Sequence, residues 1–248
     1  MTDFVVVIPA RFASTRLPGK ALREIHGKPM LQHVFERGSE SHATEVVIAT
    51  DDERIADVAS AFGATVCMTG NQHRSGTERI AEVAVLLDWA DDQIVVNLQG
   101  DEPAMPAMLI NQCAELLDDA TADIATLASP LVADEDFENP NIVKVIRDLN
   151  NHAIYFSRAA IPYAREAENS TLAATTALHH HGIYAYRCGV LRRLVVAEPS
   201  DLEICEQLEQ LRALSLGMTI VVGVPAVRPG TGVDTEADLQ RAAREITL

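Results

Sequence analysis

One basic segment near the N-terminus carries the residue types that bind phosphate. Residues 8–20, IPARFASTRLPGK, contain Arg11, Arg16 and Lys20 but no acidic side chain, on a chain whose formal net charge is -16. Arginine can bind phosphate oxygens through two parallel hydrogen bonds, and lysine supplies a compact charge that can follow a leaving pyrophosphate. The segment therefore predicts a phosphate-binding loop, and a solvated basic loop is the alternative interpretation.

Two aspartates that are distant in the sequence are the candidate metal ligands. Asp101 lies in residues 99–103, QGDEP, directly after an apolar run, and Asp234 lies in a Gly/Pro-rich turn. Magnesium usually takes one or two protein carboxylates and completes its octahedron with phosphate oxygens and water. From the residues alone, Asp101 can also be interpreted as a turn residue and Asp234 as the N-cap of the next helix.

The first 120 residues must position these groups, and their pattern predicts an α/β fold. Apolar runs predict strands and 3.6-residue periodicity predicts helices, in the order β-loop-α-β-α-β-α-β. The strands are expected at residues 4–8, 45–50, 65–68 and 93–98, and the helices at residues 29–40, from residues 51–52 onward and at 77–87. This alternation predicts a parallel sheet that binds ligands at the carboxyl ends of its strands, and the basic loop and Asp101 both follow such ends.

The rhythm changes after about residue 120. Four strands without regular intervening helices are expected at residues 123–129, 142–147, 154–156 and 182–187, and a mobile surface loop at 163–179. A long helix at residues 202–216, a strand at 219–224 and a helix at 234–245 are expected to complete the chain. We expect one domain over residues 1–248, since no interdomain linker is visible.

Composition excludes several classes of function. A sequence pI of about 4.8 argues against binding to nucleic acid or anionic membranes. No apolar run approaches the ~20 residues that cross a bilayer, and the N-terminus lacks a signal-peptide pattern. Four cysteines without metal-like spacing are expected to be buried free thiols, which are typical of a cytoplasmic protein. Residues 8–20 do not form a Walker A motif, and residues 230–232 lack the third glycine of a dinucleotide fingerprint.

The basic segment also resembles the signature of cytidylyltransferases that activate 3-deoxy-manno-octulosonate (KDO), and more loosely that of acylneuraminate cytidylyltransferases. The resemblance runs in order through nearly the whole chain. Its further blocks are GKPM at 27–30, ATD at 49–51, SGTER at 75–79, NLQGDEP at 97–103, YFSR at 155–158, GIYAYR at 182–187, LEQLR at 208–212 and PGTGVDT at 229–235. The later blocks favour the KDO branch.

The resemblance implies a Rossmann-like three-layer nucleotidyltransferase fold with a mostly parallel central sheet and a smaller mixed α+β dimerisation region. Residues 1–120 would be the nucleotide-binding half, about 121–215 the sugar-binding and dimerisation region, and 216–248 a strand and helix returning to the core. The implied reaction joins CTP and KDO into CMP-KDO and pyrophosphate for lipopolysaccharide biosynthesis, in a homodimer. The alternatives are another acidic sugar (8-amino-KDO or a sialic acid type) and a catalytically silent nucleotide-binding or regulatory module.

The resemblance also assigns site residues. It implies Mg2+ as the cofactor, with Asp101 and Asp234 as its ligands, and it makes these two aspartates catalytic together with the three cations Arg11, Arg16 and Lys20. The implied nucleotide-binding residues are Pro9, Ala10, Arg11, Arg16, Lys20, Arg74, Ser75 and Gln99. The implied sugar-binding residues are Gln99, Arg158, His180, Tyr184, Glu209 and Gln210, with Arg158 near the sugar carboxylate. Without the resemblance, Tyr184 could be plain core, and Glu209 and Gln210 a solvated helix face.

The chain departs from the family pattern beside His180. His179 and His181 stand where relatives commonly have arginine and leucine, and Arg74 stands where they usually have an uncharged residue. Consecutive strand residues point to opposite faces, so the three histidines are not expected to chelate one metal ion.

Overall fold

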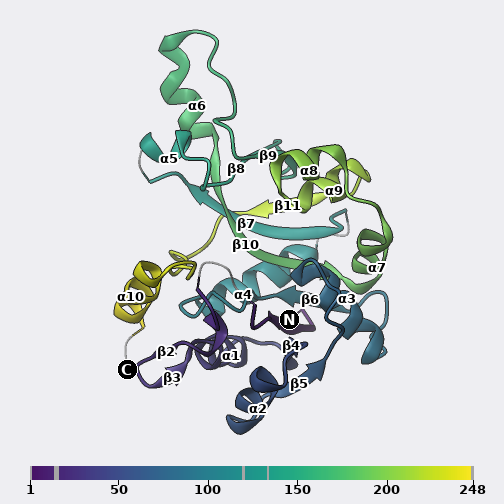
Figure 1. Cartoon of the computed structure of the whole chain (residues 1–248). Coiled ribbons are helices and arrows are strands. Elements are labelled where there is room, and N and C mark those ends of the chain that lie inside the picture. The colour runs from purple at the N-terminus through teal and green to yellow at the C-terminus, as the bar shows by residue number, and fades with distance from the viewer. Residues whose placement is uncertain (1, 14–16, 119–120, 133, 247–248) are drawn as a thin grey trace.

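The structure is a computed structural model, and it describes residues 2–13, 17–118, 121–132 and 134–246. A nine-stranded sheet forms its centre, with the main strand order β11-β7-β10-β6-β1-β4-β5 (Figure 1). The parallel part consists of β1 (Phe4–Ala10), β4 (Glu45–Thr50), β5 (Thr65–Met68) and β6 (Ile94–Asn97). The predicted α/β class with a mostly parallel sheet is therefore confirmed.

β1 is buried because layers of helices cover both faces of the sheet. Val5 and Val7 pack in one apolar cluster, while Phe4, Val6 and Ile8 pack in the cluster on the other face. This alternation follows from the two-residue period of a strand, and burial on both faces explains why the run is continuously apolar. The helices of the first half are α1 (Met30–Ser39), α2 (Glu53–Ala61), α3 (Gly76–Leu86) and α4 (Ala107–Glu115).

The second half adds antiparallel strands to the same sheet. β10 (Leu178–Arg187) lies antiparallel between β6 and β7 (Ile124–Pro130), and β11 (Ile220–Gly223) is parallel to β7. β8 (Lys144–Arg147) pairs with both β10 and β9 (Ala153–Ser157). The helices here are α5 (Asp134–Glu138), α6 (Ser170–Thr176), α7 (Cys188–Val196), α8 (Asp201–Glu206), α9 (Gln210–Ser215) and α10 (Glu236–Glu245).

The chain also contains a short hairpin and several 3-10 turns. A small hairpin is formed by β2 (Glu24–Ile25) and β3 (Lys28–Pro29). The 3-10 turns are η1 (Lys20–Leu22), η2 (Leu116–Asp118) and η3 (Ala167–Asn169). In Figure 1, α6 projects away from the sheet together with the chain around it.

Two predictions for the second half are wrong. The expected loop at 163–179 contains η3, α6 and the start of β10, because residues 178–181 pair with β7 even though three of them are histidines. The expected helix at 202–216 is two helices, α8 and α9. Gln207 lies in the left-handed region at φ 54 and ends α8, and this turn brings Leu208 into the core.

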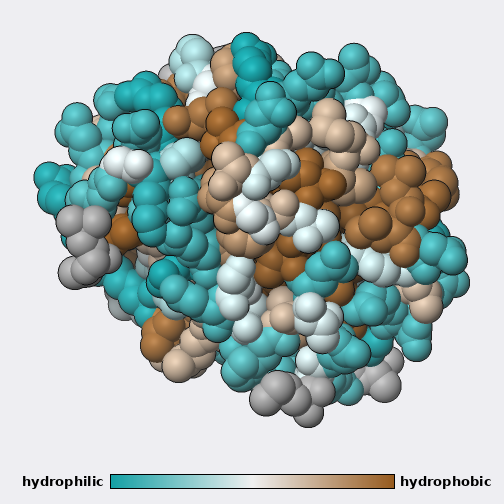
Figure 2. Space-filling model, turned by 90° about the horizontal axis from the view of Figure 1, so that it is seen from below, coloured by the Kyte–Doolittle hydropathy of each residue, from teal (hydrophilic) through white to brown (hydrophobic). Residues whose placement is uncertain are grey.

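The cysteine prediction holds for three of the four residues. Cys67, Cys113 and Cys188 are buried free thiols, whereas Cys205 is exposed, so the expected burial of Cys205 is wrong. The reason is its place on α8, a short surface helix with no buried residue. Within the part of the chain that the structure describes, no helix is long and apolar enough to cross a membrane. Seen from below, the surface is mainly hydrophilic and carries separate apolar patches (Figure 2).

Candidate functional site

A polar cleft of about 260 Å³ opens at the carboxyl ends of β1 and β6. Four segments form it: the end of β1 with the loop after it, the loop before α3, the turn after β6 and the turn before α10. Its lining residues are Pro9, Ala10, Arg11, Ala13, Lys20, Ala21, His73, Arg74, Ser75, Gly76, Arg79, Gln99, Gly100, Asp101 and Asp234. The cleft therefore lies where the predicted strand order places a ligand.

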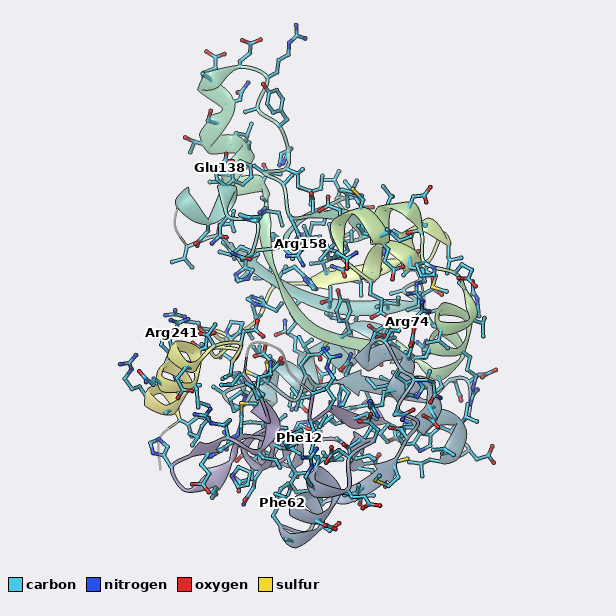
Figure 3. All side chains as sticks on the ribbon, in the orientation of Figure 1. Phe12, Phe62, Arg74, Glu138, Arg158 and Arg241 are labelled. Atoms are coloured by element: carbon cyan, nitrogen blue, oxygen red, sulfur yellow. The ribbon has the colours of Figure 1, made fainter. Side chains whose placement is uncertain are left out.

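Glycine at position 100 lets the turn after β6 approach β1 closely. A Cβ atom on Gly100 would lie 2.8 Å from the Pro9 carbonyl oxygen, a distance that real Cβ contacts essentially never show. In the loop after β1, the Phe12 ring stacks against the Arg54 guanidinium of α2. The guanidinium carbon lies 3.4 Å from the centroid of the ring. Figure 3 shows Phe12 in the lower half of the molecule, above Phe62. Gly100 thus lets the turn carrying Asp101 lie against the end of β1, and Phe12 packs the loop after β1 against α2.

Lys20 joins the two predicted metal ligands. Its Nζ donates to Asp101 Oδ2 at 2.7 Å, to the Val233 carbonyl at 2.9 Å and to Asp234 Oδ1 at 3.3 Å. The Val233 N–H also donates to the Asp101 carbonyl at 2.8 Å, which ties the two turns to each other. Two aspartates that are 133 positions apart therefore meet at one cation, and these are the two that the resemblance paired as ligands of one metal ion.

Asp234 is not the N-cap of the closing helix. Thr235 caps α10 and forms a reciprocal capping box with Asp238. The alternative interpretation of Asp234 is therefore wrong, and its carboxylate is directed to Lys20.

Glu102 is a third carboxyl group at this point, and sequence reasoning gave it no role. Burial and then the neighbouring Asp101 and Asp234 carboxylates raise the pKa of Glu102 to about 8. Its position beside Asp101 in the QGDEP turn was visible in the sequence. That position alone does not distinguish a buried carboxyl group from a solvated one. Glu102 directly follows Asp101, and Asp101 and Asp234 share one cation, so carboxyl groups are concentrated at this point.

The donor set fits Mg2+. Asp101 and Asp234 offer carboxylate oxygens from two turns that are hydrogen-bonded together. Among residues 2–13, 17–118, 121–132 and 134–246, no three His, Cys, Asp or Glu side chains form a complete metal cage. Magnesium commonly takes only one or two carboxylates and draws its remaining ligands from phosphates and water. Asp101 and Asp234 are thus suited to hold the ion beside a phosphate ligand.

The predicted nucleotide-binding residues converge on the cleft, apart from Arg16, which lies outside the described residues. Ser75 caps α3 by accepting from the Glu78 N–H, so the positive end of that helix is directed toward the cleft. Arg74 is largely exposed and pairs with Glu78 at 3.5 Å. Arg11 is also exposed and lines the cleft. The cleft thus combines several cations with backbone N–H groups.

Among the cleft residues with polar side chains, sequence reasoning missed two, His73 and Arg79. Arg79 is 4% exposed, pairs with Asp51 at 3.2 Å and donates to Thr69 and to the Gly70 carbonyl. A buried guanidinium fixed in this way forms a rigid wall rather than a mobile arm. His73 contacts the Glu82 carboxylate. Arg79 lies within the SGTER block and was visible there, but its spacing gave no reason to separate it from an exposed helix residue.

Glu209 reaches the cleft wall from the turn between α8 and α9. It accepts from Ser75 Oγ at 3.0 Å and from Thr77 Oγ1 at 2.9 Å, and burial raises its pKa. The interpretation of Glu209 as a solvated helix face is therefore wrong, because the break at Gln207 turns it inward. Gln99 lines the cleft, and the half-buried Gln210 begins α9 beside Glu209.

His180 and Tyr184 lie inside the sheet region. The His180 ring packs between Phe156 at 5.1 Å and Tyr184 at 5.2 Å, and burial lowers the pKa of His180 to about 3. His180 Nε2 lies 3.1 Å from Thr126 Oγ1. The Tyr184 hydroxyl is buried without a hydrogen-bond partner among the described residues. A buried polar atom left in this way is open to a ligand or an ordered water.

His179 and His181 lie on the strand face opposite to His180, as predicted. Their ring centroids are 4.8 Å apart, and His181 Nε2 lies 2.9 Å from Ser129 Oγ. Burial and then His179 lower the pKa of His181 to about 4. Burial also lowers the pKa of His179, so neither histidine reproduces the permanent charge of the arginine that relatives commonly carry here.

The structure does not bring Arg158 to the cleft. Its Nε donates to the Glu206 carbonyl at 2.8 Å and its Nη1 to the Pro140 carbonyl at 3.1 Å. Figure 3 shows Arg158 beside β9 and α8, apart from Arg74 at α3. Its predicted contact with a sugar carboxylate stays a prediction.

The site as a whole defines an α/β protein suited to bind a phosphorylated ligand together with a divalent cation. A family model described as Cytidylyltransferase matches residues 5–220. The 3-deoxy-manno-octulosonate cytidylyltransferase of Serratia proteamaculans (strain 568) is 51% identical over 98% of this chain and 99% of that protein. The 3-deoxy-manno-octulosonate cytidylyltransferase 1 of Actinobacillus pleuropneumoniae serotype 5b (strain L20) is 50% identical over 98% of each. The chain belongs to the cytidylyltransferase family.

Solved structures agree with this family. CMP:2-keto-3-deoxy-manno-octonic acid synthetase complexed with CTP has a TM-score of 0.89 and 41% identity, with 98% of each chain covered. A cytidylyltransferase from Leptospira borgpetersenii serovar Hardjo-bovis (strain JB197) has a TM-score of 0.60 at 17% identity, covering 96% of this chain and 83% of that one. The second likeness shows the fold alone.

Proposed function

We propose that this chain transfers the cytidylyl group of CTP to KDO, giving CMP-KDO and pyrophosphate for lipopolysaccharide biosynthesis. The observation that carries the proposal is the meeting of Lys20, Asp101 and Asp234 in the polar cleft at the sheet edge. Relatives at about half identity over nearly the whole chain are named for this activity, and a solved relative at 41% identity is described as complexed with CTP.

In this mechanism, the anomeric hydroxyl of the sugar attacks the α-phosphate of CTP in line. The new bond joins the sugar oxygen to the α-phosphorus, and the hydroxyl proton passes to solvent. The bond between the α-phosphorus and the α–β bridging oxygen breaks, and pyrophosphate leaves with that oxygen. Catalysis consists mainly of positioning and charge neutralisation. Arg11, Arg16 and Lys20 stabilise the triphosphate and the leaving group. Asp101 and Asp234 would hold Mg2+, which when bound neutralises phosphate charge and lowers the pKa of the sugar hydroxyl.

Two adjoining groups of residues select the two substrates in this proposal. Backbone groups of residues 9–11, with Arg74 and Ser75, bind the cytosine side. Gln99 and Glu209 bind the sugar side, with Gln210 next to Glu209 in sequence. The two groups adjoin each other, because the Ser75 hydroxyl that caps α3 also donates to Glu209.

The identity of the acidic sugar is tested by a substrate panel. Consumption of CTP is measured with KDO, 8-amino-KDO and N-acetylneuraminate at matched concentrations. We expect the largest kcat/KM with KDO. A larger value with either other acid would assign the chain to that sugar instead. Pyrophosphate formation by any of the three excludes a catalytically silent binding module.

We also propose that the chain forms a homodimer through its second half and works in the cytoplasm. Exposed apolar side chains on neighbouring surfaces support the dimer, with Ile154 on β9 and Leu202 and Ile204 on α8. The Ser157 hydroxyl on β9 donates to Glu206 on α8 at 2.6 Å, so these elements are adjacent. Free cysteines support a reducing compartment. Light scattering at micromolar concentration tests the dimer, and a monomer mass for the wild type would contradict it.

A further inference from the structure

The ammonium of Lys20 occupies the carboxylate oxygens that the proposed function assigns to the metal ion. Lys20 Nζ contacts Asp101 Oδ2 at 2.7 Å and Asp234 Oδ1 at 3.3 Å, and the Val233 carbonyl accepts a third hydrogen bond at 2.9 Å. An ammonium group has three N–H donors, so these contacts use all of them. The Lys20 side chain is only 17% exposed, so this ammonium occupies a largely buried site and does not form a surface ion pair.

The negative charge of the carboxyl groups around Lys20 Nζ explains why this site holds one cation. Lys20 Nζ contacts both aspartate carboxylates, and Glu102 follows Asp101 directly in the chain. Magnesium binds oxygen at about 2.0–2.1 Å and requires near-octahedral ligands. A second cation at these oxygens would lie against the ammonium, and repulsion between them makes the two occupants exclusive.

Lys20 also has another partner available when nucleotide binds. It lines the same cleft as Arg11, and the proposed function assigns both cations to the triphosphate. A lysine ammonium sits on a flexible four-carbon stem and binds phosphate as a point charge. Gly19 precedes it in the left-handed region at φ 65, so the chain turns sharply and directs Lys20 toward the two aspartates.

We propose that Lys20 competes with the divalent cation for Asp101 and Asp234, and that the triphosphate releases these carboxylates by binding the ammonium. This inference rests on the proposed function for its metal ligands. It gives Lys20 a role before the chemical step: the protein without nucleotide binds the metal weakly, and nucleotide and metal enter together. The metal site is therefore assembled only when the substrate that needs it is present.

The test is a titration of the protein with Mn2+, without nucleotide or sugar. The concentration of free Mn2+ is measured by electron paramagnetic resonance. Lys20→Met removes the ammonium and keeps an unbranched side chain. We expect this variant to bind Mn2+ at least about tenfold more tightly than the wild type, since one unit of positive charge leaves the site. Lys20→Arg keeps the charge and should stay close to the wild-type affinity. Lys28→Met is the matched control, because Lys28 pairs with Glu36 away from the cleft.

A second titration tests the release by nucleotide. With CTP present and no sugar, Mn2+ affinity should rise more in the wild type than in Lys20→Met, so that the two proteins converge. CTP binds Mn2+ by itself, so the comparison is between proteins at the same CTP concentration. Equal or weaker Mn2+ binding by Lys20→Met in the absence of CTP would overturn the competition, as would no Mn2+ binding by either protein. Circular dichroism confirms that each variant is folded.

The outcome is separable from that of the proposed function. Mn2+ competition is measured without either substrate, whereas cytidylyl transfer is measured by product formation. Tighter Mn2+ binding by Lys20→Met would support the competition even if the preferred sugar were not KDO. Conversely, active wild-type enzyme with equal Mn2+ affinity in both proteins would refute the competition and leave the activity in place.

Discussion

Replacement of Asp101 by asparagine is the sharpest perturbation of the site. The Asp101 carboxylate accepts from Lys20 at 2.7 Å, and only its backbone carbonyl bonds to the turn carrying Asp234. Asn keeps the shape of the side chain and that backbone contact. The change therefore removes one negative charge from the proposed metal site and leaves the turn in place.

The expected cost falls on the transition state. A carboxylate that holds a cation beside the reacting phosphate stabilises the transition state electrostatically. The size of this effect is comparable to that of one oxyanion-hole donor. We expect Asp101→Asn to lose at least ~3 kcal/mol of transition-state stabilisation, roughly a hundredfold in kcat. The assay is continuous pyrophosphate release with CTP, Mg2+ and KDO, each varied in turn. The apparent Mg2+ requirement should also rise, since one of two protein ligands is weakened.

A matched control separates charge at the site from charge on the chain. Asp57 is exposed on α2, and Asp57→Asn makes the same chemical change away from the cleft. We expect its kcat and its midpoint of thermal unfolding to match the wild type. Near-normal turnover by Asp101→Asn, with an unchanged Mg2+ requirement, would refute the assignment of Asp101 as a metal ligand.

Three further predictions concern the walls of the site and the histidine strand. Arg79→Met breaks a buried pair with Asp51 and should lower the free energy of unfolding by about 3–5 kcal/mol in urea titrations; a loss below about 1 kcal/mol would contradict the buried pair. Gly100→Ala brings a Cβ to 2.8 Å from the Pro9 carbonyl, so we expect about 1–3 kcal/mol of destabilisation and a raised KM for CTP; unchanged values would show that the turn relaxes freely. The pKa of His181 is lowered to about 4, so the unfolded chain binds more protons between pH 4 and 6.5 and stability falls as pH drops through that window, by up to about 1.4 kcal/mol per pH unit. His181→Gln should flatten this dependence in denaturant titrations at several pH values, and an equally steep dependence would disprove the assignment.

The first half of the fold was predictable because its central strands, β1 and β6, are covered on both faces. A strand such as β1 must then be continuously apolar, and its neighbours alternate with amphipathic helices. The loop chemistry followed from the topology, because Asp101 and the basic segment leave adjacent parallel strands at the same edge. Local sequence and tertiary structure agree in this region.

The second half was harder because tertiary contacts override the local pattern. Residues 178–181 have no apolar alternation, and they form β10 only because β7 and β8 lie ready to pair with them. The helical periodicity continues through Gln207, although the chain turns there to bury Leu208 and to direct Glu209 to Ser75. A single residue in the left-handed region leaves no mark on hydrophobic periodicity.

The site was predictable in its composition and less so in its contacts. Asp101 and the basic segment were expected at one edge, and the resemblance added Asp234; the structure places Lys20 between Asp101 and Asp234. The buried position of Arg79 was not predictable, because an arginine on a helix is ordinarily solvated. Arg158 was assigned to the sugar site through resemblance alone. In the structure it donates to backbone carbonyls of Glu206 and Pro140, and a sequence motif does not specify such contacts.

The central claim is that the cleft joins CTP to KDO with the help of a divalent cation. Its most direct test is identification of the products by mass spectrometry and pyrophosphate release, with CTP, KDO and Mg2+ present and with each omitted in turn. We predict equimolar CMP-KDO and pyrophosphate only when all three are present, and loss of both products on chelation of the metal. No CMP-KDO from folded protein with all three components, or undiminished turnover after chelation, would contradict the account.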